Sequence, residues 1–396
     1  MQIMHWMQRL WATAFRRREL RNTALALYWF PVSFCRLFLV GVLSFSNLSD
    51  VLVAGGCIRP TTLLAGLRHG TVSVKRLPVA LLLTVSGLVV EPFAWLQSLL
   101  FHRRIQACRC PDNPVVVIGH WRSGTTYLHQ LLSADPCAAT ARNQFIIAPQ
   151  AALILKPLLN HFLRRVMTQH RPIDAVSWGP EDPQEDEVGL ARLTMDSHMS
   201  GIAFPQDYPR HFRRTVLHSS TQFERHFLQF TRLTWLYEGA GKTHLVIKNS
   251  VHTARIALLL RLFPRARFVY LYRRPLDSVR SLVQVKQRLA RLVGLQLPPS
   301  SLQQVEETAA AHGQLQEAYE RSKHLIPPGQ LIEVAYDDLV QTPQVTMQRI
   351  YQSLQISGWS TAQPAIEARI AKGKMYQAEP VVLEPEAEQR LRALLS

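Results

Sequence analysis

Short apolar runs alternate with amphipathic segments over most of the chain. The runs are rich in valine, isoleucine, leucine and aromatic residues and have the length of buried strands. The predicted strands are 114–119, 243–249, 266–274 and 330–339, and the predicted helices after them are 124–134, 252–263, 276–293 and one from about Thr342. This alternation predicts an α/β fold of the P-loop-like type, a three-layer sandwich with a central parallel sheet.

The first hundred residues follow a different pattern. Two apolar runs, 24–46 and 77–101, each approach the roughly 20 residues that cross a bilayer. Charges interrupt both runs, Arg36 the first and Glu91 the second, and a charge at the centre of a bilayer is costly. We therefore expect an α-helical hydrophobic region that either associates with a membrane or covers the folded domain.

Length and charge narrow the domain organisation and the class of ligand. The 396 residues allow one large domain with an appendage, and we expect the N-terminal region over 1–112 and the catalytic domain over 113–396. The net charge of +17 favours an anionic partner, such as acidic lipid or a multiply phosphorylated ligand. Without zinc-finger spacing or a basic tail, nucleic acid is not expected.

Cysteine usage bears on the compartment. The chain has five cysteines, an odd number that is scattered and lacks paired metal-binding spacing. This favours reduced thiols, so the predicted location is the cytoplasm, with membrane association through the apolar N-terminal region.

The first predicted strand leads into the sequence GHWRSGTTYLH. Gly119 and Gly124 match the phosphate-binding pattern G-x-x-x-x-G-K-[ST], but Thr125 stands in place of the lysine. A strand, a glycine turn and a helix gather backbone N–H groups around one point, which favours an anion there. Arg122 lies inside the loop and can supply the missing positive charge.

A second basic element follows the third predicted strand. Arg273 ends that strand, and Ser281 lies eight residues further on the next helix. We expect the two side chains to converge on a further phosphate group, although Arg273 could instead pair with Asp277 and cap the helix. No acidic residue stands where a nucleoside triphosphatase holds Mg²⁺, so no metal is expected.

Taken together, these motifs resemble those of the PAPS-dependent sulfotransferases. Residues 122–127 are similar to the family's 5′-phosphosulfate loop, and 273–281 are similar to its 3′-phosphate element. The stretch 246–255, with Lys248, resembles the lysine-containing element between them. Two further segments resemble a bacterial-type branch of the family, 180–193 and 336–343.

The chain departs from the usual pattern at several positions. Trp121 replaces a frequent proline, Tyr127 stands where some members place a tryptophan against adenine, and 249–251 lacks the usual Ser/Thr-Pro. None of these changes removes an essential donor. The C-terminal ARIAKGKMYQ is only weakly similar to a third phosphate-binding segment, and an ordinary basic helix end is the favoured interpretation.

The resemblance implies the donor 3′-phosphoadenosine 5′-phosphosulfate (PAPS), which is released as 3′,5′-ADP. The implied donor-binding residues are Arg122, Ser123, Gly124, Thr125, Thr126, Tyr127, Arg273 and Ser281. Arg122, Lys248 and the loop N–H groups of 123–126 would stabilise negative charge on the leaving oxygen.

A hydroxyl acceptor also needs a general base. The acidic run EDPQEDE supplies Glu187 as the first candidate, because it opens the apolar side of a predicted helix, and Glu185 as the second. His252 is the third. The alternatives are a solvated helix N-terminus for the acidic run and a packing or capping role for His252.

The acceptor itself is not specified. A hydroxyl or amine of a lipid or carbohydrate fits the apolar N-terminal region, and 195–209 is a candidate substrate-contacting segment. Two other functions remain open: a P-loop kinase or triphosphatase, and a non-enzymatic membrane adaptor that keeps a relic nucleotide site.

Overall fold

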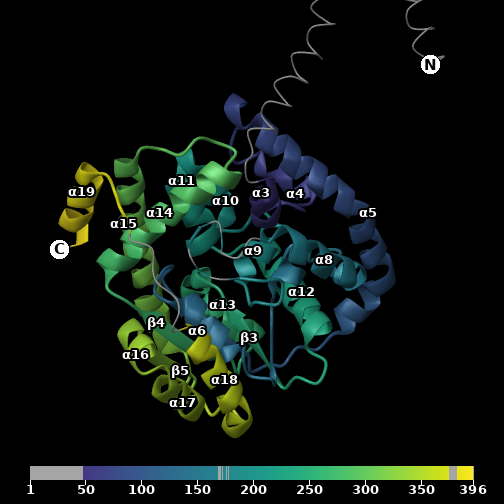
Figure 1. Cartoon of the computed structure of the whole chain (residues 1–396), viewed down its shortest axis with the longest axis vertical. Coiled ribbons are helices and arrows are strands. Elements are labelled where there is room, and N and C mark those ends of the chain that lie inside the picture. Colours follow the sequence, from purple (N-terminus) through teal and green to yellow (C-terminus); the bar gives the residue numbers. More distant parts are fainter. Residues whose placement is uncertain are drawn as a thin grey trace, which may run out of the picture. The chain divides into compact units, whose positions relative to one another are not determined.

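The structure, a computed structural model, describes residues 48–167, 171, 173–174, 176, 178–373 and 381–395 (Figure 1). The predicted apolar run 24–46 lies outside these residues. Residues 49–396 form one compact unit, and the boundary expected after residue 112 does not divide it.

A five-stranded sheet lies at the centre of this unit. Its strands are β1 (Val115–Gly119), β2 (Ala138–Thr140), β3 (His244–Lys248), β4 (Arg267–Tyr272) and β5 (Leu331–Ala335), in the order β2-β3-β1-β4-β5. Every pair is parallel. Four strands are those the sequence predicts, and β2 is a short edge strand that it does not. The fourth predicted strand is too long, because α16 (Tyr336–Gln341) begins directly after β5.

Helices cover both faces of the sheet, as the valine-rich strands require. On β1, Val116 and Ile118 pack into one core while Val115 and Val117 pack into the other. The first core is completed by α7 (Asn143–Ile146), α8 (Ala152–Val166), α12 (Thr221–Glu238), α13 (Ile256–Leu262) and α15 (Ser301–Ser322), and the second by α6 (Thr125–Leu132), α17 (Pro343–Ser353) and α18 (Trp359–Gly373). The three-layer α/β prediction is confirmed.

Shorter elements surround the carboxyl ends of the strands. They are α9 (Asp186–Leu190), α10 (Met199–Ala203), η2 (Pro205–Asp207), α11 (Tyr208–Phe212), η3 (Arg213–Leu217) and η4 (Ser250–Ala254), whereas η5 (Lys323–Leu325) precedes β5 at the opposite edge. The longer α14 (Pro275–Val293) follows β4, and α19 (Pro385–Leu395) packs against α14 and α15. Figure 1 shows α19 beside α15, at the rim of the unit.

The described part of the N-terminal region is helical, as predicted. It contains α3 (Leu48–Gly55), α4 (Pro60–Gly66), η1 (Val74–Arg76) and α5 (Leu77–Ala107). The long α5 packs against α8 and α12 and runs along the periphery (Figure 1). Glu91, the charge that interrupts its apolar sequence, is paired with Arg59 and accepts a hydrogen bond from Trp95.

Length and composition would let α5 cross a membrane. Val74–Ala107 passes this criterion, and only 28% of its most apolar window is buried in the protein. The outer face of α5 includes Val89, Trp95 and Leu99, each at least 66% exposed. A core helix of a globular domain would bury such side chains.

Candidate active site

The loop after β1 has the geometry of an anion-binding turn. Gly124 precedes α6 with a φ of +94°, and a Cβ at this position would come within 2.5 Å of the Tyr336 ring. Only glycine tolerates both the backbone conformation and the contact. Within the described chain the N–H groups of Gly124, Thr125 and Thr126 have no hydrogen-bonding partner. These N–H groups therefore remain available to a bound anion at the start of α6.

Ser123 has a different place from its neighbours. Its backbone N–H donates to the carbonyl of His120 over 3.2 Å, and its hydroxyl donates to the same carbonyl over 2.7 Å. The side chain is 1% exposed and does not line the cavity described below. Ser123 shapes the turn, so the expectation that its N–H group faces the donor does not fit the geometry.

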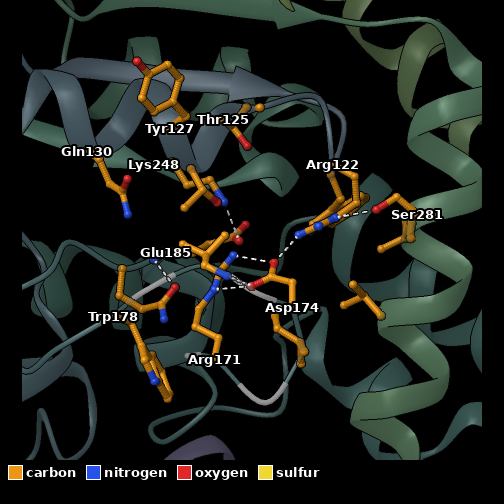
Figure 2. A pocket seen from close by; sticks show the side chains of 18 of the residues that line it. Arg122, Thr125, Tyr127, Gln130, Arg171, Asp174, Trp178, Glu185, Lys248 and Ser281 are labelled. Atoms are coloured by element: carbon orange, nitrogen blue, oxygen red, sulfur yellow. Dashed lines mark hydrogen bonds and ion pairs between the residues drawn. The ribbon is translucent and has the colours of Figure 1, made fainter. Parts of the chain in front are cut away.

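Arg122 joins the two basic elements that the sequence predicts. Its Nε donates to the Ser281 hydroxyl over 2.9 Å, and its Nη1 donates to an oxygen of Asp174 over 2.8 Å (Figure 2). Arg273 in turn donates to the carbonyl of Arg122 over 3.1 Å. Arg122 and Arg273, 151 positions apart in the chain, thus meet at one edge of the sheet, because β1 and β4 are parallel neighbours.

Arg273 does not pair with Asp277, the carboxylate in the first turn of α14. Asp277 pairs instead with Arg274, over 2.9 Å, so the alternative interpretation of Arg273 as a helix cap is wrong. The Arg273 guanidinium lies over the Tyr336 ring, 4.3 Å from its centre. This stacking holds the guanidinium beside the loop.

A buried aspartate that the sequence analysis missed links two arginines. Asp174 accepts hydrogen bonds from both Arg122 and Arg171, and Figure 2 shows the three side chains together. Burial alone would raise the pKa of Asp174, but the two guanidinium groups outweigh it and hold the pKa below its usual value. No local motif marks this contact, because Asp174 is 52 residues from Arg122.

Lys248 and Glu185 form an ion pair at the end of β3. The Lys248 Nζ lies 2.6 Å from Glu185 Oε2, and Oε1 accepts a hydrogen bond from the Ser250 backbone over 3.0 Å. Both side chains line the cavity, and Figure 2 shows them facing each other. The Lys248 side chain is only 6% exposed, so the alternative that it is a surface lysine is wrong.

The preferred base from the sequence, Glu187, lies in a different environment. Its carboxylate accepts hydrogen bonds from Asn249 over 2.7 Å and from the His198 backbone over 2.5 Å, and it pairs with Arg255 at 3.4 Å. Glu187 is 1% exposed and is not among the cavity-lining residues. Of the two candidates, Glu185 therefore lines the cavity and Glu187 does not, and Glu187 is not a solvated helix terminus either.

His252 packs in the interior. Its ring contacts Phe227 edge-on at 4.8 Å, and it does not line the cavity. Burial, with Arg255 adding to it, lowers the pKa of His252 well below the ordinary value. The packing interpretation fits this histidine better than the catalytic one.

One large cavity connects these residues. Its volume is about 1430 Å³, more than the roughly 300–1,000 Å³ of most small-molecule sites. One end is polar and includes the loop residues 124–127 with Arg273 and Ser281. The remaining wall is largely apolar, and the side chains that line it include Val53, Ala54, Ile146, Ile147, Ile202, Leu289, Leu292 and Val293.

Two further segments reach the cavity. Arg369 and Lys372 near the end of α18 line it, and Tyr127 approaches Gly373, so ARIAKG lies where the less favoured interpretation placed it. His198 and Met199 come from the predicted substrate-contacting segment 195–209. No group of three or more histidine, cysteine or acidic side chains suited to a metal ion occurs in the part of the chain that the structure describes.

The fold and the cavity define an α/β protein whose site lies at the carboxyl ends of parallel strands. Comparison with known proteins narrows this class. A model of the sulfotransferase family matches residues 114–361, which is more than half of the chain. The chain belongs to the sulfotransferase family.

Individual relatives agree with this assignment. The omega-hydroxy-beta-dihydromenaquinone-9 sulfotransferases Stf3 of Mycobacterium bovis and Mycobacterium tuberculosis are 27% identical to this chain over 301 residues, 75% of this chain and 77% of theirs. Among solved structures, sulfotransferase STF9 of Mycobacterium avium superimposes with a TM-score of 0.58 at 17% identity, covering 80% of each chain. STF1 of Mycobacterium tuberculosis gives 0.57 at 16% identity, covering 90% of this chain and 98% of its own. These two structures support the fold.

Proposed function

We propose that this protein transfers the sulfuryl group of PAPS to a hydroxyl of a lipid acceptor by in-line displacement. The observation that carries the proposal is the lining of one cavity. The anion-binding loop, the Lys248–Glu185 pair and many apolar side chains all contribute to it. A polar nucleotide and an apolar acceptor can therefore meet at one pair of reactive side chains.

The polar end offers donors for a nucleotide with two separate anionic groups. The free N–H groups of 124–126 and the Arg122 guanidinium suit the 5′-phosphosulfate. Arg273 and Ser281 suit the 3′-phosphate, and Tyr127 and Lys372 line the space beside the loop. A Cβ at Gly124 would collide with the Tyr336 ring, so glycine there preserves the turn that leaves the loop N–H groups free.

Lys248 and Glu185 divide the chemistry of the transfer between them. Glu185 accepts the proton of the acceptor hydroxyl while the hydroxyl oxygen forms a bond to sulfur. The bond from sulfur to the bridging oxygen breaks, and its electron pair stays on the 5′-phosphate of 3′,5′-ADP. Lys248 leaves Glu185 and donates to that bridging oxygen, where negative charge develops. The ion pair holds both side chains at the cavity before the substrates bind.

A lipid acceptor follows from the apolar wall and from the relatives. The Stf3 proteins are named for a lipid-like acceptor with a terminal hydroxyl, omega-hydroxy-beta-dihydromenaquinone-9. In this chain, α3 supplies Val53 and Ala54 to the cavity wall, and the long apolar α5 belongs to the same N-terminal region. Attachment of α5 to the cytoplasmic face of a membrane would keep such an acceptor close to the site.

Calorimetry with 3′,5′-ADP and ATP tests the donor. We expect 3′,5′-ADP to bind more tightly than ATP, and Arg273→Ala to weaken 3′,5′-ADP binding by roughly 10- to 100-fold, the range for a hydrogen bond to a charged group. Arg274→Ala is the matched control, because Arg274 is the neighbouring arginine, does not line the cavity and pairs with Asp277. Equal binding of ATP and 3′,5′-ADP, unaffected by Arg273→Ala, would contradict the proposal.

Transfer itself is tested with radioactive PAPS, labelled with ³⁵S, and an ω-hydroxylated prenyl quinone. We expect a labelled lipid product that still forms in EDTA. A product that forms only from ATP and Mg²⁺ would instead indicate the kinase or triphosphatase alternative. If Lys248→Ala altered no catalytic activity, the non-enzymatic adaptor would be the better interpretation.

A further inference from the structure

His198 is held at the cavity wall by three contacts that do not use its Nδ1 atom. Its backbone N–H donates to Glu187 over 2.5 Å, its ring stacks on Trp121 at 4.4 Å, and its Nε2 lies 3.2 Å from the Tyr208 hydroxyl. The residue is 3% exposed and lines the cavity. Among the described residues Nδ1 has no hydrogen-bonding partner.

The Tyr208 hydroxyl determines which nitrogen of His198 carries the proton. This phenol is buried, and in the described chain His198 Nε2 is the one hydrogen-bonding partner of its oxygen. A buried phenol proton needs an acceptor, so Tyr208 donates to Nε2. The neutral ring then carries its own proton on Nδ1.

The ring is neutral at physiological pH. Burial, with the Lys286 ammonium nearby adding to it, lowers the pKa of His198 to about 3, although Glu185 acts in the opposite direction. Lys286 is itself buried, lines the cavity and lies over the Tyr208 ring at 3.2 Å. His198 therefore presents a neutral N–H donor in the neighbourhood of Glu185.

We propose that the Nδ1–H of His198 donates a hydrogen bond to the oxygen of the acceptor hydroxyl and thereby selects hydroxyl over amine acceptors. This inference rests on the proposed function and assigns the acceptor side of the same site.

The selectivity follows from lone pairs. A hydroxyl oxygen has two: one forms the bond to sulfur, and the other accepts from His198 while the hydroxyl proton passes to Glu185. The electron pair of the broken sulfur–oxygen bond leaves with 3′,5′-ADP. The nitrogen of a neutral amine has one lone pair, and the bond to sulfur uses it. An amine therefore cannot attack sulfur and accept the His198 hydrogen bond at once.

Two substitutions of His198 separate the donor from the packing. Glutamine places its amide near the position of Nε2 and removes the donor at Nδ1, whereas asparagine places an amide N–H near Nδ1. The probes are geranylgeraniol and geranylgeranylamine, each with labelled PAPS. His198→Gln should lower kcat/KM for the alcohol about 10-fold, the effect of one lost hydrogen bond, and change the amine less than about 2-fold. His198→Asn should keep the alcohol-to-amine ratio within about 3-fold of wild type.

Control measurements separate the role of His198 from the proposed sulfotransferase function. His211 is a buried histidine of α11 outside the cavity, so His211→Gln should leave the alcohol-to-amine ratio unchanged. The affinity for 3′,5′-ADP should stay at the wild-type value in every variant. If wild type itself fails to bind 3′,5′-ADP, the proposed function is wrong, whatever the ratios are.

Two results would overturn the role of His198 alone. In the first, His198→Gln lowers kcat/KM equally for the alcohol and the amine. In the second, His198→Asn lowers the alcohol-to-amine ratio of kcat/KM as much as His198→Gln does. Tyr208→Phe gives a second measurement if the glutamine variant does not fold. It frees the ring to move its proton to Nε2, so the ratio should fall a few-fold, and an unchanged ratio would count against the inference.

Discussion

The two ends of the cavity are built in different ways. The polar end is formed largely by short motifs at the carboxyl ends of neighbouring strands: Arg122 and Arg273 follow β1 and β4, and Lys248 is the last residue of β3. The apolar wall is assembled from side chains of α3, α7, α10 and α14, which share no motif. Under the proposed function, the donor requires fixed hydrogen bonds, whereas the lipid acceptor requires only shape and burial. The proposed donor site is therefore encoded by local motifs, and the proposed acceptor site is not.

Glu185, which lines the same cavity, should give the largest effect. Replacing it with glutamine removes the proposed base, so kcat should fall about 10²- to 10⁴-fold while 3′,5′-ADP still binds. Glu187→Gln is the comparison, because that carboxylate pairs with buried Arg255. We expect it to lower the melting temperature more than kcat. Stopped assays and thermal melts of both variants measure the difference, and a larger loss of kcat in Glu187→Gln would restore the order that the sequence suggested.

Lys248→Ala should have the next largest effect. Loss of one preorganised donor to developing charge costs about 10²- to 10³-fold in kcat. A variant with wild-type kcat would show that the leaving oxygen is stabilised elsewhere.

Ser281→Ala tests the polar end alone. The hydroxyl contacts Arg122 and faces the cavity, so its loss should weaken 3′,5′-ADP binding by about 10-fold and leave ATP binding unchanged. The KM for the lipid acceptor should not change. An equal shift for ATP would mean that Ser281 does not contact the 3′-phosphate.

Leu289→Ala tests the apolar wall alone. Removing buried methylene groups should raise the acceptor KM up to about 10-fold for a long prenyl alcohol, and less for a short one. The affinity for 3′,5′-ADP, measured by calorimetry, should stay constant. An equal change of KM for short and long alcohols would mean that the prenyl chain of the acceptor does not bind against Leu289.

The smallest expected effect is on the melting temperature at low pH. Because Arg171 and Arg122 hold the pKa of Asp174 below the value it has in the unfolded chain, the carboxylate contributes stability at neutral pH. That contribution is lost as pH falls through the folded-state pKa. Asp174→Asn should therefore melt a few degrees lower than wild type at pH 7, and the two melting temperatures should converge once the pH falls below the folded-state pKa of Asp174. A gap that persisted at low pH would indicate a packing defect.

Much of the fold could be predicted from the sequence, because buried parallel strands are continuous apolar runs. Four strands and the loop–helix junction at Thr125 followed from this pattern, whereas β2 is three residues of alanine and threonine at a sheet edge, too short to carry a signal. The sequence ranked Glu187 above Glu185 because both were treated as residues of one helix. Glu185 precedes α9 in extended conformation, with a ψ of 130°, so reasoning from one helical face did not apply.

Other site residues depend on contacts that no local pattern marks. His198 is positioned by Trp121 and Tyr208, and Asp174 by arginines on either side. Such residues become visible only when the fold brings distant segments together. The weak similarity of ARIAKG gave a usable signal, since Arg369 and Lys372 do line the cavity.

The backbone at Arg122 has a consequence for evolution and for engineering. Its φ of +68° is left-handed, a conformation that costs a residue other than glycine about 1–3 kcal/mol. Glycine or asparagine would relieve this cost but would remove the guanidinium that joins the loop to Ser281 and Asp174. Selection for thermal tolerance alone would therefore favour sequences that lose the arginine, and keeping it there marks a position where stability is given up for activity.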